Sequence, residues 1–392
     1  MSLLLKVARL TMEHDTFRTL IKKQVSFNFS KVSLRLDLCE SLFSSFSVDL
    51  GTKALLNSLR KDDSIDYSRI LDLGCGYGPV GLFLKAQEPS RNVHMVDRDA
   101  LAVDFSLHNA SLNHLDVSVY PSLDYEQVEG NFSLIATNFP AKMATRGLEV
   151  FVYGASEHLF SSGIFAMVVV RELAGKLDTI LDNRMIRVLY REDKKGHCIR
   201  HVAFSGKIPL LVNKYERQKM KLKLTKTYTV KTAFSLPEFD SLGYATKCMF
   251  SILKTMKNYD SVFILEPGQG YNAIAIMDLL KPRELIIASR DLLSLTFAKQ
   301  NVANNFGFEP QTMLVSHLRN PPEQELVVWN VLHKRDFTLN ACNLKAIIKS
   351  GKPLLIYGEK SVLRTLLGKE SIIVLEKADQ KNYCAQLVKL EK

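Results

Sequence analysis

The sequence lacks several features that would assign a protein to a class at once. Its six cysteines form no C-x-x-C pair, and no group of histidines and cysteines has the spacing of zinc ligands. No apolar run reaches the roughly 18 residues that a membrane-spanning helix needs, and the N-terminal apolar patch is too short for a signal peptide. We therefore expect a soluble, cytoplasmic protein of a reducing compartment, without disulfides, bound metal or a membrane span.

The dinucleotide-binding fingerprint is also absent. The stretch ILDLGCGYGPVGLFL has a glycine-dense turn after a short apolar strand, but Pro79 stands where the third glycine of G-x-G-x-x-G would be. Gly74, Gly76 and Gly78 instead recur at every second position, so the backbone can turn sharply and approach a ligand without obstruction by Cβ atoms. Asp97 ends the next strand, and a carboxylate about 20 residues beyond such a turn is placed to accept hydrogen bonds from ribose hydroxyls.

Two more carboxylates and a cysteine lie near this turn in the sequence. Asp72, inside the turn, is placed to hold a positively charged ligand group such as the ammonium of an amino acid. Asp49, in DLGT, either borders the same pocket or caps the N-terminus of a helix. Cys75 has no histidine or lysine beside it to activate a thiolate, so we interpret it as a packing residue.

Positive charge is concentrated in one part of the chain. The net charge is +11, and the segment 184–231 has fourteen Lys or Arg against three acids, which accounts for the whole excess. This segment is either a solvated linker or a strip that contacts the phosphates of a nucleic acid. Its Tyr190, Tyr215 and Tyr228 would suit stacking on bases, although they could equally be core residues.

An internal repeat indicates that the chain contains two related domains. LDLGCGYG (71–78) aligns with LEPGQGYN (265–272) at a shift of 194 residues. VDRDALAVDFSLHNASLN (96–113) aligns with ASRDLLSLTFAKQNVANN (288–305) at a shift of 192. A repeat of this length suits the duplication of a whole domain rather than a solenoid.

Each half alternates short apolar strands with helices, which predicts an α/β fold. We expect two tandem Rossmann-like domains, each a mostly parallel sheet with helices on both faces, and ligands at the carboxyl ends of the strands. The expected boundaries are 1–205 for the first domain, 206–225 for a basic linker and 226–392 for the second domain.

The turn D-x-G-x-G-x-G, the acid after the second strand and the N-x-P motif in IATNFPAK resemble a class I S-adenosylmethionine-dependent methyltransferase. The run SSFSVDLGTKALLNSL and the helix with HNASLN are similar to the small-domain methyltransferases related to bacterial ribosomal RNA guanine-N2 methyltransferases. Several of these have two tandem copies, one active and one degenerate. The resemblance implies an enzyme of rRNA processing with S-adenosyl-L-methionine as its cofactor and an RNA amino group, expected to be guanine N2, as its target.

The resemblance also implies roles for particular residues. Asn138 would accept hydrogen bonds from the amino group and orient its lone pair toward the methyl group, while Pro140 stiffens the loop. Phe139 replaces the first proline of the family's N-P-P-x motif and is the candidate to stack on a flipped base. The family's acid near the adenine aligns with Ser122, for which Asp124 can substitute.

The second half has lost parts of this site. At the shifts above, Asn272 replaces Gly78, Ser289 replaces Asp97 and NVLH replaces NFPA, so we expect no cofactor there. That half would instead clamp a substrate or brace its partner domain.

Two other functions stay open. The departures at Phe139, Ala141 and Ser122 favour a catalytically inactive RNA-binding or assembly factor. The same N-x-P chemistry would also suit methylation of a protein glutamine amide. RNA bound through the segment 184–231 is the expected partner, and the sequence does not indicate an oligomeric state.

Overall fold

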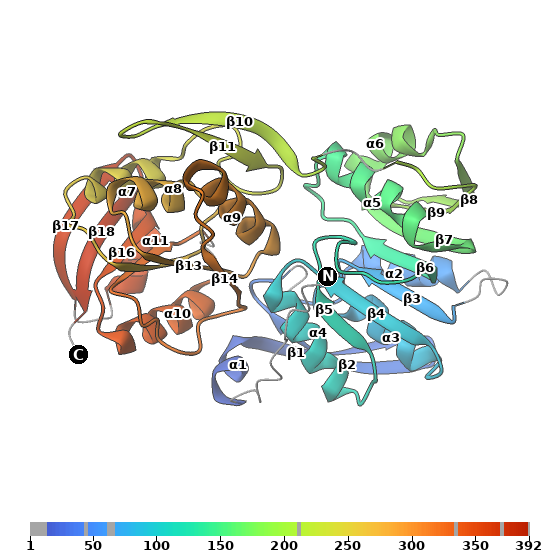
Figure 1. The fold of residues 1–392 in the computed structure, drawn as a ribbon. Coiled ribbons are helices and arrows are strands. Elements are labelled where there is room, and N and C mark those ends of the chain that lie inside the picture. The colour runs from blue at the N-terminus through green and yellow to red at the C-terminus, as the bar shows by residue number, and fades with distance from the viewer. Residues whose placement is uncertain are drawn as a thin grey trace.

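The computed structural model describes residues 14–42, 46–60, 67–209, 213–332, 336–368 and 372–390. Its elements form two halves that lie side by side (Figure 1). The first half consists of α1 (His14–Leu20), β1 (Ile21–Phe29), β2 (Val32–Cys39), α2 (Leu50–Leu59), β3 (Arg69–Leu73), α3 (Pro79–Gln87), β4 (Asn92–Asp97), α4 (Ala100–Leu112), β5 (Ser118–Pro121), β6 (Phe132–Asn138), α5 (Thr145–His158), β7 (Leu159–Val170), α6 (Arg171–Leu181), β8 (Ile186–Asp193) and β9 (His197–Phe204). The second half consists of β10 (Glu216–Lys223), β11 (Thr227–Ala233), α7 (Tyr244–Leu253), β12 (Ser261–Leu265), α8 (Tyr271–Leu279), β13 (Glu284–Ser289), α9 (Leu292–Phe306), β14 (Gln311–Leu314), β15 (Leu326–Asn330), α10 (Phe337–Ser350), β16 (Leu354–Glu359), α11 (Lys360–Leu367), β17 (Ile372–Gln380) and β18 (Tyr383–Leu390).

Each half contains one seven-stranded sheet, and the two sheets have the same topology. Their strand orders are β5-β4-β3-β6-β7-β9-β8 and β14-β13-β12-β15-β16-β18-β17. The first five strands of each order are parallel, and the last two pair antiparallel at one edge. This confirms the predicted α/β fold of two tandem Rossmann-like domains with mostly parallel sheets.

Helices cover both faces of the first sheet because successive strand residues point to opposite sides. Ile70 packs in a core with α2, α3 and α4, whereas its neighbour Leu71 packs in a second core with α5 and α6. Strands buried on both faces need mostly apolar residues without alternation. The sequences of β3, β6 and β7 contain such mainly apolar runs, which is why the sequence predicted them.

Each sheet is accompanied by an antiparallel hairpin, β1–β2 in the first half and β10–β11 in the second. An asparagine ties each hairpin to a helix in the same way. The Asn109 side chain of α4 accepts a hydrogen bond from the Asp37 amide, and the Asn301 side chain of α9 accepts one from the Lys231 amide. The hairpins are therefore part of the repeated unit.

The strand β10 lies inside the segment 206–225, which the sequence analysis assigns to a linker. Because β10 pairs with β11 and its side chain Leu222 enters the core of the second half, we propose that the second domain begins with β10. The segment 184–231 comprises four strands, so the alternative of a solvated linker does not describe it.

The structure corrects the alignment of the two glycine turns. The strands β3 and β12 begin 192 residues apart, as do the helices α3 and α8, so the shift of 194 is wrong at this point. Gly78 corresponds to Gly270, which has the same left-handed backbone (φ 95° and 88°), and not to Asn272. The residue that replaces a turn glycine is Glu266, with φ 59°, at the position of Gly74.

The described residues contain neither a membrane-spanning helix nor a cluster of metal ligands. No helix there is long and apolar enough to cross a membrane. The described part of the chain also contains no group of three or more His, Cys, Asp and Glu that could hold a metal ion.

Candidate active site

A cavity of about 510 Å³ lies at the carboxyl ends of β3, β4 and β6. The strand β3 is the switch point of the first sheet, because the chain continues to β4 on one side of it and to β6 on the other. Crevices at such points are the usual ligand sites of open α/β sheets. The glycine turn follows β3, Asp97 is the last residue of β4, and the N-x-P motif begins at the end of β6; residues of all three line the cavity.

The glycine turn forms one wall of the cavity. Gly74 and Gly76 have left-handed backbones (φ 75° and 59°), and a Cβ atom added to either would meet no atom within 4 Å. Both residues line the cavity, so a ligand can approach their backbone closely. Gly78 has another role, because a Cβ there would lie 2.9 Å from the side chains of Leu82 and Met95. It is a packing glycine at the start of α3 and not one of the cavity residues.

Asp97 is fixed at the cavity by two backbone hydrogen bonds. The amides of Gly76 and Asp99 donate to its two carboxylate oxygens, each at 3.0 Å. Burial raises the pKa of Asp97 to about 6, and the neighbouring charge of Asp99 adds to the effect. Each carboxylate oxygen has a second lone pair, so the side chain can still accept hydrogen bonds from ribose hydroxyls.

Asp72 lies deeper, 2% exposed, at the end of β3. Its Oδ2 accepts a hydrogen bond of 2.8 Å from the amide of Gly81 in α3. Burial, together with a smaller effect of the charge of Asp97, raises the pKa of Asp72 to about 7. A cationic ligand group would offset that desolvation, so the role of Asp72 stays a prediction.

Ser122 and Asp124 also line the cavity, as predicted. The Ser122 hydroxyl donates to the backbone carbonyl of Asp124 at 2.6 Å, and its amide donates to the carbonyl of Asp97 at 2.9 Å. Ser122 is therefore occupied with holding the loop. The carboxyl of Asp124 is the acid at this wall of the cavity; burial raises its pKa, and a hydrogen bond from Tyr215 offsets part of that rise.

Asn138 ends β6 on the opposite side of the cavity from Asp97. Its side-chain NH2 donates to Asp49 Oδ2 and to Thr52 Oγ1, both at 3.0 Å. Asp49 also accepts from the Thr52 amide and so caps α2, which shows that both interpretations of Asp49 hold. Because both amide hydrogens of Asn138 are used, its Oδ1 is the atom available to accept a hydrogen bond from a substrate.

The comparisons with known proteins agree with this geometry. The profile of the methyltransferase small domain matches residues 34–199. The uncharacterized protein YbxB of Bacillus subtilis is 30% identical over 186 residues, which are 45% of this chain and 90% of that protein. The chain belongs to the methyltransferase small-domain family. This membership confirms the class recognised in the sequence, an S-adenosylmethionine-dependent methyltransferase, together with its cofactor.

Two further proteins similar to this chain are named as ribosomal RNA methyltransferases. Ribosomal RNA small subunit methyltransferase C of Aeromonas hydrophila is 34% identical over 131 residues, which cover 32% of this chain and only 37% of that protein. The structure of the 16S rRNA N2 G1207 methyltransferase of T. thermophilus, in complex with AdoMet and guanosine, has a TM-score of 0.69 at 14% identity. That match covers 95% of this chain and all of the other, so the two proteins share the fold of both halves.

A further observation supports S-adenosylmethionine as the ligand of the cavity in this small-domain methyltransferase. Thr137 is 1% exposed and lines the cavity, and its hydroxyl has no hydrogen-bond partner among the residues that the structure describes. A buried hydroxyl without a partner is unfavourable unless a ligand supplies one. Together with the glycine backbone and the carboxylates Asp72 and Asp97, it provides groups that a polar, cationic nucleoside requires.

The structure does not bring Phe139 into the methyltransferase site. Its ring is 2% exposed and packs against Phe151 and Phe165 in the core below α5. It cannot stack on a flipped base from there. Pro140 lines the cavity, as does Phe151, an aromatic residue of α5 that the sequence analysis missed. Lys142, also missed, lines the cavity although it lies in the quoted motif NFPAK.

In the second half, Glu266 stands at the position of Gly74, so the turn there carries a side chain. The carboxylate of Glu266 accepts hydrogen bonds from the Ser289 hydroxyl at 2.6 Å and from the Arg290 amide at 3.1 Å. Ser289 stands at the position of Asp97, and Ile264 at that of Asp72. We therefore keep the prediction that the second half holds no cofactor, with Glu266 as the reason in place of a lost Gly78.

Proposed function

We propose that this protein transfers a methyl group from S-adenosylmethionine to an amino group of RNA, with guanine N2 of ribosomal RNA as the target. The observation that carries the proposal is the position of Asn138, held by Asp49 and Thr52 across the cavity from the glycine turn and Asp97. The ribosomal RNA methyltransferases among the relatives support RNA as the substrate. We also propose that it acts in the cytoplasm.

The residues of the chain would act by positioning the methyl acceptor and the cofactor relative to each other. S-adenosylmethionine, when bound, supplies an electrophilic methyl group. The Oδ1 of Asn138 accepts a hydrogen bond from the exocyclic amine, which turns the nitrogen lone pair out of conjugation with the ring and toward the cofactor side of the cavity. Phe151 offers an apolar surface for the base, and Lys142 a positive charge near the phosphates.

The basic segment contributes to RNA binding through β10 rather than as a whole. In β8 and β9, Arg191 and Arg200 are paired with Asp178 and Asp193 inside the first half. The tyrosines are also engaged. The hydroxyls of Tyr228, Tyr215 and Tyr190 donate to Asp278, the Leu123 carbonyl and Glu192. Their rings also pack against hydrophobic cores, so they do not form an open stacking surface.

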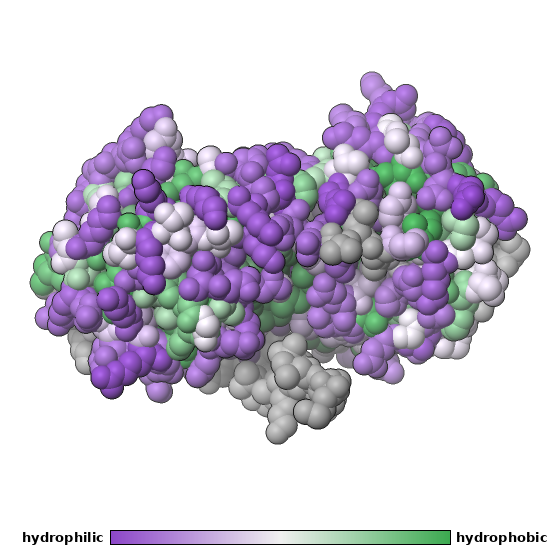
Figure 2. Space-filling model, turned by 45° about the horizontal axis from the view of Figure 1, so that its top comes forward, coloured by the Kyte–Doolittle hydropathy of each residue, from purple (hydrophilic) through white to green (hydrophobic). Residues whose placement is uncertain are grey.

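Exposed positive charge lies on the outer face of β10. Arg217, Lys219, Lys221 and Lys223 alternate with inward-facing residues and are exposed, although Arg217 pairs with Asp240 at 3.0 Å. The hairpin extends along one side of the second half toward the first (Figure 1), and the face that includes it is mainly hydrophilic (Figure 2). We assign the phosphate contacts to this strand.

The test is a methyl-transfer assay with S-adenosylmethionine labelled in its methyl group. The substrates are in vitro transcribed small-subunit ribosomal RNA, assembled subunits and a ribosomal protein fraction. We expect label in RNA, and N2-methylguanosine in the nuclease digest by mass spectrometry. Asn138→Ala should abolish transfer and preserve cofactor binding. Asn330→Ala, at the corresponding position of the second half, is the matched control and should retain activity.

The same assay separates the alternatives. Label in glutamine of the protein fraction would replace RNA by a protein amide, which presents the same N–H groups to Asn138. Cofactor binding without transfer to any of the substrates, combined with RNA affinity, would indicate an inactive assembly factor. The buried position of Phe139 is the observation that favours this alternative.

A further inference from the structure

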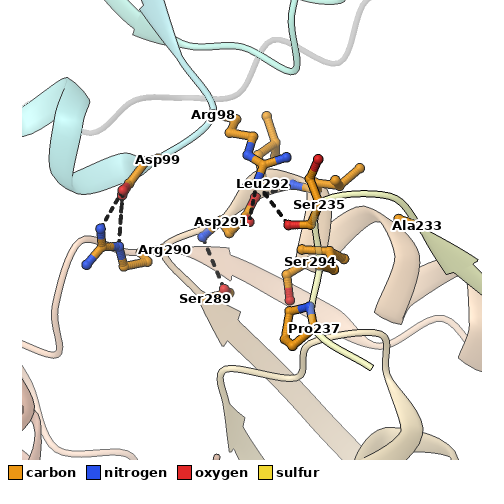
Figure 3. Close-up of polar contacts among 12 residues, drawn as sticks. Arg98, Asp99, Ala233, Ser235, Pro237, Ser289, Arg290, Asp291, Leu292 and Ser294 are labelled. Carbon is orange, nitrogen blue, oxygen red and sulfur yellow. Dashed lines mark hydrogen bonds and ion pairs between the residues drawn. The ribbon is translucent and has the colours of Figure 1, made fainter. Parts of the chain in front are cut away.

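The two halves meet through corresponding residues arranged about a pseudo-twofold axis (Figure 3). Arg98 of the first half pairs with Asp291 of the second at 3.3 Å, and Arg290 of the second pairs with Asp99 of the first. The backbone repeats the exchange. The Ala100 amide donates to the Arg290 carbonyl at 2.8 Å, and the Leu292 amide donates to the Arg98 carbonyl at 3.0 Å. Because a shift of 192 converts each contact into the other, the interface resembles that of a symmetric dimer.

The two arginines differ in exposure and in the number of groups that they contact, although their pairings are symmetric. The Arg98 side chain is 33% exposed, and it also donates to the carbonyl of Ser235. The Arg290 side chain is 7% exposed, and its nitrogens contact both oxygens of Asp99, the carboxylate of Asp336 and the carbonyl of Ser41. A guanidinium with this many acceptors fixes the groups around it.

These contacts reach the cofactor cavity of the first half. Asp99 lines the cavity and donates its amide to Asp97, and Ser41 lines it from the loop after β2. Ser235 lines the cavity from the second half and has a left-handed backbone with φ 67°. The degenerate half therefore supplies part of the wall and anchors two other parts.

We propose that the second half completes the cofactor site of the first, with Arg290 as a positioning residue that holds Asp99 and thereby the ribose-binding Asp97. Arg290 does not line the cavity. It acts through Asp99, whose carboxylate lies beside Asp97. The inference rests on the assignment of this cavity to S-adenosylmethionine, and it is independent of whether the methyl acceptor is RNA.

The charges around these groups determine the expected effect. Asp97 faces Asp99, Arg98 and Asp72, and the charge of Asp99 raises its pKa. Arg290 faces Asp99, Asp336 and Glu266. Without the guanidinium, the carboxylate of Asp99 beside Asp97 loses its cationic partner. Asp97 then ionises at higher pH and is held less firmly, so the cofactor binds more weakly near neutral pH.

The experiment is calorimetric titration of the full chain with S-adenosylmethionine from pH 4.5 to 8.5. For Arg290→Met we expect about tenfold weaker binding at pH 7 and a pH midpoint raised by about one unit. Arg319→Met removes another arginine of the same interface, which pairs with Asp104 at 3.6 Å and does not line the cavity. It should bind as the unchanged chain does.

Asp99→Asn distinguishes positioning from a general loosening of the interface. Asparagine still caps α4, as Asp99 does by accepting from the Leu101 amide, but it removes the charge beside Asp97. Added to Arg290→Met, it should bring the pH midpoint back down. Alone, it should lower the midpoint below that of the unchanged chain, which tests the proposal even if Arg290→Met does not fold.

Three outcomes would overturn the proposal. One is a pH profile that stays unchanged both in the single variant Arg290→Met and in the single variant Asp99→Asn. Another is a loss of binding in Arg319→Met equal to that in Arg290→Met, which would assign the effect to the interface in general. The third is absence of cofactor binding in the unchanged chain, which would overturn the cofactor assignment as well and so differs from the first two.

Discussion

At the scale of single residues, the hydroxyl of Thr137 has opposite consequences for stability and for binding. It is buried without a partner among the described residues, so removing it relieves an unfavourable group. We expect Thr137→Val to raise the free energy of unfolding by about 1 kcal/mol and to weaken S-adenosylmethionine binding several-fold. Chemical denaturation and calorimetry measure the two effects.

Thr232→Val is the matched control for this substitution. Thr232 is equally buried, but its hydroxyl donates to the carbonyl of Phe239 at 2.8 Å. Its loss should lower stability by about 1 kcal/mol and leave cofactor binding unchanged. If Thr137→Val also lowered stability, this would contradict the interpretation that the Thr137 hydroxyl is unpaired until it binds a ligand.

The raised pKa values of Asp72 and Asp97 predict how cofactor stabilisation depends on pH. Both carboxyls are protonated more readily in the folded chain, with pKa values of about 7 and 6 against 3.8. Their contribution to stability is therefore full below about pH 4 and is lost as the pH rises through 6 and 7. A cationic ligand favours the ionised form of Asp72.

We accordingly expect the increase in melting temperature on adding S-adenosylmethionine to grow between pH 6 and pH 8. Thermal unfolding with and without cofactor measures it. In Asp72→Asn, most of the pH dependence near 7 should disappear. An increase that stays constant from pH 6 to 8 in the unchanged chain would show that Asp72 does not meet a cation.

The sequence predicted the residues whose position follows from the motif alone. Asp72 and Asp97 lie at or next to the ends of strands, Gly74 and Gly76 come just after one, and strand ends meet at one edge of a parallel sheet. It could not place Phe139 or Phe151, because the choice of which ring enters the core depends on how α5 packs on the sheet. For the same reason, no pattern indicated that Asp49 would hold Asn138.

At the scale of secondary-structure elements, the outer face of β10 predicts a salt-dependent affinity for RNA. Reversing Lys219, Lys221 and Lys223 to glutamate removes three exposed positive charges from one strand face. We expect weaker binding of ribosomal RNA at each salt concentration. The slope of log K against log salt should become shallower by about 2 to 3, because each phosphate contact contributes about 0.7 to 0.9. Filter binding at several salt concentrations measures it.

Lys345, Lys349 and Lys352 provide the control, since they lie on or just after α10, on the far side of the second half from β10 (Figure 1). Reversing them changes the net charge by the same amount. Equal effects of the two triple variants would mean that RNA responds to total charge and not to the strand.

The misaligned glycine turns illustrate what a sequence comparison within one chain can miss. The segment between α2 and β3 is two residues longer than that between α7 and β12, and connecting segments tolerate such differences. The alignment by sequence similarity alone kept the shift of 194, which is correct for α2 and α7, beyond this difference in length, where the correct shift is 192. The left-handed backbones before α3 and α8 fix the register, because that conformation recurs at Gly78 and Gly270.

At the scale of the whole molecule, two domains of one fold should hold a single cofactor. Calorimetry should give one S-adenosylmethionine per chain, since Glu266 occupies the turn in the second half. Asp97→Ala should weaken binding by about tenfold to hundredfold, as expected for hydrogen bonds to a charged group. Two sites per chain, or a site that survives Asp97→Ala, would contradict this assignment.

The pseudo-twofold contact between the halves has an evolutionary consequence. In a dimer of identical subunits, every substitution alters both sites at once, whereas fusion into one chain lets each copy vary separately. The first copy could keep its site while the second gave up its own and remained as a neighbour. Selection on Arg290 and Ser235 then acts through a site in the other half. In relatives with the same duplication, residues at the positions of Arg290 and Asp99 should change together.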